Sequence, residues 1–363
     1  MRLLVAIPLL LALLAGCDSG GAGPGTPAGD EIVDGVNLTD LFARPSGAEE
    51  SAVRAEWADR DADRGARYSY TTLPAIIAPD AAELIVYTAR PPAGGEPIHH
   101  GVVRRPPRLP GDVARRPVVL VLPAHGATVT VGTAMAAVPL ADTIRDDCVY
   151  VIAAYRGQTL DVEGSAFTSP ADPGSVYDVD ADDAMALLTA VLATDFLADA
   201  GRLAVAGYDR GGTAALLVGN RFPDLDLVVS LAAPTDFTLP TVRHMARAYL
   251  LGQSVGAFPA FEQVAAAVVE PLRGGAGDLA AARLALIRRS PAHFVAPPPF
   301  VFASHGFLDG TVPVAHGRAL AGIQGTSESV YLEQAEHDHG SILTSNEVIS
   351  TVSSLFIERV RDP

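Results

Sequence analysis

The chain contains no lysine, so all 26 of its basic side chains are arginines. They are outnumbered by 42 acidic residues, which gives a formal net charge of −16 at pH 7. A surface of this sign repels nucleic acid and anionic lipid headgroups, so neither is expected as a partner. The charge balance does not identify a substrate.

Cysteine is also scarce, with two residues in a chain of 363. Cys17 lies near the N-terminus, and Cys148 directly precedes the apolar run Val149–Ala154. Once Cys17 is accounted for, a single cysteine remains, and it has no partner for an internal disulfide. We therefore interpret Cys148 as a buried structural thiol and not as a catalytic nucleophile.

The N-terminus has the pattern of an export signal. Arg2 is followed by the apolar run Leu3–Leu14, which is shorter than the roughly 20 residues that a bilayer span requires. The sequence "LAGC" that ends at Cys17 resembles the lipobox of bacterial lipoproteins, in which the cysteine carries lipid. We expect residues 1–17 to be a lipoprotein-type signal peptide, Cys17 to be lipidated, and the exported protein to be anchored to a membrane of the cell envelope. An ordinary signal peptide cleaved nearby is the alternative.

Two further segments precede the main domain. Residues 18–29, "DSGGAGPGTPAG", have the composition of a flexible tether. Ala48–Asp61 predicts a helix with the only tryptophan, Trp57, turned inward. We assign residues 18–66 to the tether and this lead helix, and residues 67–363 to one domain.

Strand and helix patterns alternate along most of this domain. Three short antiparallel strands are expected after Arg67, and six buried strands follow, separated mostly by helical segments. The six are Pro117–Leu122, Cys148–Ala154, Leu203–Ala206, Leu227–Leu231, Phe300–Ala303 and Ser329–Leu332. This alternation predicts an α/β protein with a doubly wound, mostly parallel sheet. A helical insertion at about residues 238–297 lies where it can cover a pocket.

Polar residues follow the predicted strands at the edge where doubly wound sheets bind ligands. The segment "GYDRGG", residues 207–212, has the strand–turn–helix pattern of a nucleophile elbow, with Asp209 where serine usually stands. Later strands are followed by Asp309 and by the two histidines His337 and His339. The order of elbow residue, acid and histidine is that of the α/β-hydrolase triad.

The segment from Arg67 to the C-terminus resembles the α/β-hydrolases, and within them the prolyl oligopeptidase and dienelactone hydrolase branch. The resemblance rests on an ordered set of motifs: "YRGQT", "DVDADDA", "GYDRGG", "RSPAHF", "HGFLDGTVP" and a late histidine. It implies the α/β-hydrolase fold, hydrolase activity, and a small molecule or short peptide as substrate. It implies no cofactor.

The resemblance also assigns roles to individual residues. Asp309 is the expected triad acid, and His337 is the expected base because its spacing from the last strand fits better than that of His339. The oxyanion hole is expected from backbone N–H groups, one at Arg210 and one in the loop His125–Ala127, at Gly126 or Ala127. No metal is expected, since a zinc site that used both histidines would lack an evident third ligand.

Asp209 departs from the family pattern and leaves three alternatives open. It is a carboxylate nucleophile, as in haloacetate dehalogenases and epoxide hydrolases, or a base toward water, or part of an inactive elbow. Against the first, the insertion offers Tyr249 and His244 but no tryptophan to bind a leaving group. The sequence thus predicts a hydrolase with an Asp209-Asp309-His337 site. The alternative is a catalytically degenerate binding protein of the cell envelope.

Overall fold

The computed structural model describes residues 30–107, 112–172, 176–294, 299–323 and 329–363. Cys17, the signal-like segment and the tether lie outside the described residues, so their assignments remain predictions. Within the described ranges, no helix combines the length and apolar character that crossing a membrane requires.

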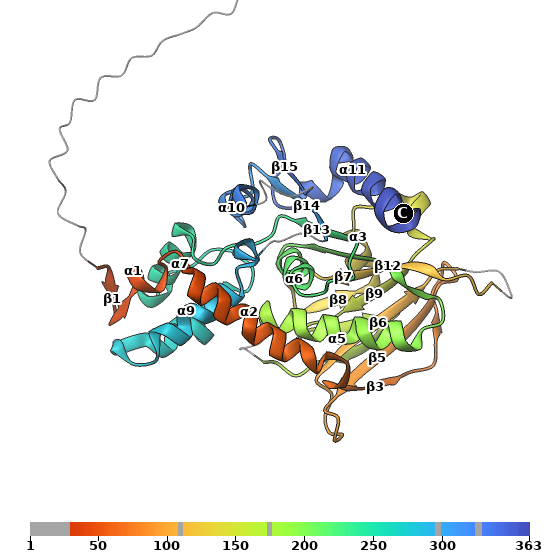
Figure 1. Cartoon of the computed structure of the whole chain (residues 1–363), viewed down its shortest axis with the longest axis horizontal. Coiled ribbons are helices and arrows are strands. Elements are labelled where there is room, and N and C mark those ends of the chain that lie inside the picture. The colour runs from red at the N-terminus through yellow and green to blue at the C-terminus, as the bar shows by residue number, and fades with distance from the viewer. Residues whose placement is uncertain (1–29, 108–111, 173–175, 295–298, 324–328) are drawn as a thin grey trace, which may run out of the picture.

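A sheet of ten strands forms the centre of the described residues (Figure 1). Its order is β15-β14-β13-β12-β7-β9-β6-β5-β3, with β4 paired to β5. The strands from β15 to β9 are parallel, and the remaining pairs are antiparallel. The bounds are β3 Ser69–Thr72, β4 Ile76–Ile77, β5 Glu83–Arg90, β6 His99–Arg105, β7 Arg116–Leu122, β9 Val149–Ala153, β12 Ala198–Tyr208, β13 Leu227–Leu231, β14 Phe300–Gly306 and β15 Val330–Gln334. This confirms the predicted α/β class with a mostly parallel, doubly wound sheet.

Helices cover both faces of the sheet, which explains why its central strands are apolar without alternation. In β7, Leu120 packs into the core beneath α2, α5 and α6, whereas Val121 packs into the core beneath α3 and α11. The helices are α1 Leu38–Leu41, α2 Gly47–Ala62, α3 Val131–Ala136, α4 Asp142–Arg145, α5 Asp178–Thr194, α6 Arg210–Gly219, α7 Pro240–Leu250, α8 Phe261–Val264, α9 Leu279–Arg288, α10 Ala315–Ile323 and α11 Asn346–Phe356.

Smaller elements complete the chain. A hairpin of β1 (Ile32–Val33) and β2 (Val36–Asn37) begins the described residues, and a second sheet has the order β11-β10-β8. Its strands are β8 Thr128–Thr130, β10 Thr159–Val162 and β11 Ser165–Thr168. Single 3₁₀ or π turns span Arg64–Ala66, Ala265–Val269, Glu270–Gly275, Pro291–His293, Ser341–Thr344 and Ile357–Arg361.

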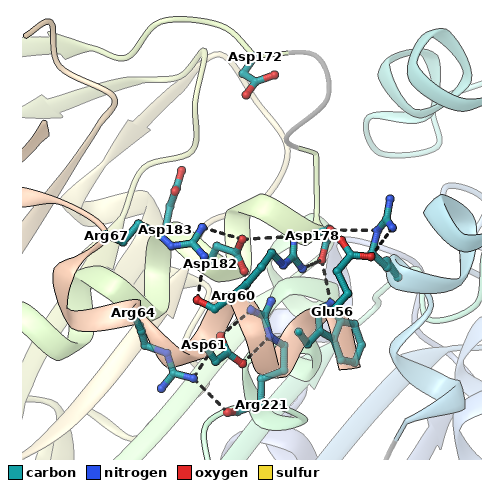
Figure 2. Close-up of polar contacts among 12 residues, drawn as sticks. Glu56, Arg60, Asp61, Arg64, Arg67, Asp172, Asp178, Asp182, Asp183 and Arg221 are labelled. Atoms are coloured by element: carbon teal, nitrogen blue, oxygen red, sulfur yellow. Dashed lines mark hydrogen bonds and ion pairs between the residues drawn. The ribbon is translucent and has the colours of Figure 1, made fainter. Parts of the chain in front are cut away.

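The connection between β13 and β14 carries α7, α8 and α9, which lie together at one end of the sheet (Figure 1). The lead helix α2 runs from these helices along α5. Trp57 of α2 is 3 % exposed, so it is turned inward as predicted, and its Nε1 donates to Asp178. Figure 2 shows the arginines that surround Asp178 and Asp182 at the start of α5. The lead helix is therefore held against the sheet domain by buried contacts.

Candidate active site

The turn after strand β12 has the geometry of a nucleophile elbow. Asp209 stands between β12 and α6 with φ +60° and ψ −127°, a region that costs a non-glycine residue roughly 1–3 kcal/mol. A Cβ at Gly211 would overlap the carbonyl of Leu122, and one at Gly207 would overlap the backbone of Gly211. The two glycines thus permit the close approach of strand and helix that holds Asp209 at the tip of the turn.

The two carboxylate oxygens of Asp209 have different surroundings. Oδ2 accepts a hydrogen bond of 2.8 Å from the backbone N–H of His125. Oδ1 is buried and lies 3.3 Å from Nε2 of His339, with which it forms an ion pair and a long hydrogen bond. One oxygen is therefore held by the backbone, and the other faces an imidazole ring.

The histidine at this position is His339, so the prediction that His337 would face Asp309 is wrong. Nδ1 of His339 and Oδ2 of Asp309 are 2.7 Å apart. Nδ1 of His337 instead lies 3.1 Å from the carbonyl of Ser341. The reason is in the backbone: the carbonyl of His337 accepts the N–H of Leu308, which fixes His337 beside the end of β14. The chain turns once more before it brings His339 to the elbow.

Asp309 lies where the triad acid was expected, with its side chain fully buried. Its Oδ1 accepts the backbone N–H groups of Thr311 at 2.9 Å and Val312 at 2.7 Å, and Nε2 of His305 lies 3.4 Å from Oδ2. Burial alone would raise the pKa of the carboxyl group. Hydrogen bonds from His305, His339 and Val312 outweigh burial and hold this pKa well below its usual range. Asp309 is consequently ionised at neutral pH.

The two carboxylates also set the charge of His339. Burial lowers the pKa of the imidazole, but hydrogen bonding and attraction to Asp209 and Asp309 outweigh this effect and raise the pKa to about 9. The ring is then an imidazolium at neutral pH. In the resting site His339 can donate a proton but cannot accept one.

Of the backbone donors predicted for an oxyanion hole, the one that the structure places on Asp209 belongs to His125. Gly126 and Ala127, the predicted loop positions, line a neighbouring cavity. The N–H of Arg210 is the first of helix α6, so it has no acceptor within the helix. The loop His125–Ala127 and the start of α6 remain the predicted sources of the two N–H donors of an oxyanion hole.

The side chains that brace the elbow were not singled out from the sequence. The buried guanidinium of Arg210 donates to Asp180 through Nε and Nη2, both at 2.9 Å, and lies 4.5 Å from the ring centroid of Tyr155. Gln158 donates to the carbonyl of Gly126 at 2.9 Å and so fixes the loop after β7. Asp180 and Gln158 do lie within the motifs "DVDADDA" and "YRGQT", but all four aspartates of the first motif are buried, and the pattern does not tell which of them pairs with Arg210.

Other candidate groups have separate places. His244 lines a cavity beside the loop that follows Asp309, whereas Tyr249 lies against the guanidinium of Arg273. Cys148 is buried, as predicted, with its Sγ 3.6 Å from the carbonyl of Ile144. Across the described ranges, no three or more His, Cys, Asp or Glu side chains are arranged to hold a metal ion.

Comparison with known proteins finds likeness in structure alone. No protein-family model matches the chain, and no curated protein matches it. The acetyl xylan esterase from Paenibacillus sp. R4 superposes with a TM-score of 0.58 at 12 % identity, over 87 % of this chain and 98 % of the esterase. Acetyl xylan esterase 1 from Thermoanaerobacterium sp. JW/SL YS485 gives 0.54 at 14 % identity, over 84 % and 92 %.

An S-formylglutathione hydrolase from Agrobacterium tumefaciens gives a TM-score of 0.51 at 15 % identity, over 80 % of this chain and 99 % of the hydrolase. Identities this low carry no information on activity or substrate. The superpositions show the fold, and they accord with the sheet order described above. The chain has the α/β-hydrolase fold.

Proposed function

We propose that this protein is a hydrolase in which Asp209 is a carboxylate nucleophile toward a saturated carbon of a small organic substrate. The observation that supports this most is the difference between the two oxygens of one carboxylate. Oδ2 accepts a hydrogen bond of 2.8 Å from the N–H of His125, whereas Oδ1 is buried and faces Nε2 of His339 at the longer distance of 3.3 Å. A nucleophile needs a lone pair that is not already committed to a donor, and Oδ1 has one.

A carboxylate nucleophile suits displacement at saturated carbon better than acyl transfer. Attack on an amide carbonyl gives an adduct that collapses back, because a carboxylate leaves far more readily than an amine. In a displacement, a bond forms between Oδ1 and carbon while the bond from carbon to the leaving group breaks. The product of this step is an alkyl ester of Asp209.

The charge on His339 favours an epoxide as the substrate class. When the epoxide ring opens, its oxygen leaves as an alkoxide that needs a proton. The imidazolium Nε2 lies 3.3 Å from the attacking Oδ1 and carries such a proton. His339 becomes neutral in the step in which Asp209 loses its charge, so its pKa returns toward its ordinary value. A halide leaving group needs no proton.

The neutral imidazole can then act as the base for hydrolysis of the ester. It takes a proton from a water molecule whose oxygen attacks Cγ of Asp209. Negative charge develops on Oδ2, the oxygen to which His125 already donates. The intermediate expels the alkoxide, which takes the remaining water proton. The products are a 1,2-diol, the Asp209 carboxylate and protonated His339, so atoms and protons balance.

Trapping the ester on Asp209 separates its formation from its hydrolysis. With 1-bromohexane, His339→Gln is expected to accumulate a hexyl ester on the peptide that contains Asp209, because bromide leaves without a proton and the ester then lacks its base. With 1,2-epoxyhexane, the same variant is expected neither to turn over nor to trap, because the acid is missing as well. His337→Gln is the matched control, since its ring contacts Ser341 outside the site, and it should keep turnover of both substrates.

The different-class alternative is a binding protein without turnover. It is favoured if wild type converts no epoxide or haloalkane and no adduct forms on Asp209 in the His339→Gln variant. An adduct on any residue other than Asp209 would also contradict the carboxylate mechanism.

We also propose, from the sequence, that the protein is exported and held at a membrane through lipid on Cys17. Cys17→Ser is expected to release the protein from the membrane fraction or to block its processing. The measurement is fractionation together with the intact mass of the mature chain. An unchanged membrane fraction and an unchanged mass would contradict the lipobox interpretation.

A further inference from the structure

Residues of the insertion help to line three adjoining cavities near the candidate site. The Met245 cavity has a volume of about 400 Å³, the central cavity about 290 Å³ and the Arg156 cavity about 330 Å³. The first two share the wall 255–258, and the last two share His125 and Gln263. His125, which lines the central and Arg156 cavities, donates its backbone N–H to Asp209, so these two cavities lie one residue away from the proposed nucleophile.

The Met245 cavity is largely apolar and adjoins the triad acid. Gly310 and Thr311, which directly follow Asp309 in the chain, form one side. Met245 of helix α7, with Val255 and Phe258 from the segment after it, contributes apolar surface to the rest. Its volume lies within the range of small-molecule sites, roughly 300–1,000 Å³.

The Arg156 cavity, on the other side of His125, is polar. It is lined by Arg156, Gln158 and Gln263, and Arg156 is held by Asp183 through Nε at 2.8 Å. A groove that is apolar at one end and polar at the other orients an amphipathic small molecule, because polar groups lose hydrogen bonds with water when they enter an apolar cavity.

We propose that the Met245 cavity is a binding site for the hydrocarbon substituent of the substrate, an alkyl chain or one aromatic ring. This inference rests on the proposed function for the identity of the reacting group, which the substituent would carry to Asp209. Each methylene that enters the cavity should raise affinity about fourfold until the cavity is full. The preferred substrates are then terminal epoxides with a hydrocarbon tail, ahead of the shortest epoxides.

Binding can be measured without turnover through methionine methyl groups. In protein labelled with methyl-¹³C methionine, 1-hexanol is expected to shift the Met245 resonance in a saturable way, with affinity falling from 1-hexanol to 1-butanol to ethanol. Met185 is fully buried in the core, and Met135 lines a separate cavity beside α3, so both serve as internal controls. A Met245 resonance that does not respond, or responds no more than Met135, would overturn the proposal.

A pair of matched variants tests the location. Ala257 is exposed and lines the Met245 cavity, so Ala257→Trp should fill it and abolish the effect of 1-hexanol on Met245. Ala280→Trp places the same side chain at an exposed position of α9 and should leave the effect intact. Equal responses of Met245 to 1-hexanol in the two variants would overturn the assignment.

Turnover distinguishes failure of this inference from failure of the proposed function. If wild type hydrolyses epoxides, kcat/KM should rise with chain length, and Ala257→Trp should remove this rise whereas Ala280→Trp should keep it. Turnover without any dependence on chain length would overturn the cavity assignment and leave the nucleophile in place. Saturable binding of 1-hexanol without turnover of any substrate would overturn the proposed function and uphold the binding site.

Discussion

The proton on His339 is held by two carboxylates that come from different turns of the chain. Asp309 follows strand β14 and contacts Nδ1, whereas Asp209 follows strand β12 and faces Nε2. In a serine hydrolase the second contact would be to a neutral hydroxyl group. The aspartate at the elbow therefore changes the protonation state of the histidine as well as the nucleophile.

This ion pairing predicts how stability depends on pH. The pKa of His339 is raised from about 6.5 in the unfolded chain to about 9. Its contribution, on the order of 3 kcal/mol, is fully present below pH 6.5 and is lost as pH rises through 9. The pKa of Asp309 is lowered, so its contribution is lost as pH falls below about 4. The difference in free energy of unfolding between wild type and His339→Gln, from urea titrations, should thus shrink between pH 6.5 and 10. A constant difference would contradict the raised pKa.

Replacement of the elbow residue should restore acyl chemistry. Asp209→Ser supplies a hydroxyl group and removes the charge that keeps His339 protonated. We expect at least a tenfold gain in p-nitrophenyl acetate hydrolysis at pH 7.5 over wild type. His339→Ala in that background should abolish the gain, and His337→Ala should not. A folded Asp209→Ser variant without any gain would show that the backbone donors and the acid–histidine pair do not form a working acyl-transfer frame.

The choice between the two histidines shows the limit of sequence at this scale. Spacing from the last strand favoured His337, but one backbone hydrogen bond to Leu308 and one ring contact to Ser341 decide the outcome. Neither contact has a pattern in the sequence. Asp209 and Asp309 were candidates because Asp209 directly follows β12 and Asp309 lies three residues beyond the end of β14, and both strands contain buried apolar runs.

Among the elements, the lead helix α2 has the most unusual attachment. The buried carboxylate of Asp182 on α5 receives three arginines, Arg60 at 3.4 Å, Arg67 at 2.9 Å and Arg221 at 2.6 Å. Arg60 belongs to α2, so this carboxylate joins the lead helix to the domain (Figure 2). Arginine suits such a buried site because its planar guanidinium makes several directed hydrogen bonds.

Removal of Asp182 should therefore be costly. Asp182→Ala leaves buried guanidinium groups without their shared partner, and we expect the free energy of unfolding to fall by about 3–5 kcal/mol. The matched control is Asp142→Ala, since the Asp142 side chain is 96 % exposed and its ion pair is with Arg145, three residues along the chain. That variant should change the free energy of unfolding by less than about 0.5 kcal/mol in the same urea titration. Equal effects would contradict a role for the buried cluster.

Helices and strands were more predictable than these contacts. The helix predicted over Ala48–Asp61 is α2, Gly47–Ala62, because Ser46 and Glu49 form a capping box at its start. The six predicted parallel strands all appear. Five of them are apolar runs buried on both faces, which leave little choice of structure, whereas β15 is a partly exposed edge strand. The pairing between the four acidic residues of "DVDADDA" and the arginines was not predictable. Arg60 and Arg67, for example, pair with aspartates that lie more than a hundred residues later in the sequence.

In the molecule as a whole, the lead helix links parts that flank the candidate site. Glu49 pairs with Arg283 and Glu56 with Arg288 on the insertion helix α9, each at 2.7 Å. Further along the same helix, Asp61 pairs with Arg221 of the sheet domain at 2.6 Å. The helix that follows the predicted tether thereby fixes the insertion, which walls the groove, to the sheet, which carries Asp209.

The two mechanisms for Asp209 predict different sources for the new oxygen atom of the diol. A carboxylate nucleophile supplies that oxygen itself, whereas a general base leaves water to supply it. In single-turnover hydrolysis of 1,2-epoxyhexane in H₂¹⁸O, the diol should take its new oxygen from Asp209 and contain no ¹⁸O. Mass spectrometry of the peptide that contains Asp209 should then show one ¹⁸O in its carboxylate. Label found in the diol, with unlabelled Asp209, would mean that water attacks the substrate directly and would contradict Asp209 as the nucleophile.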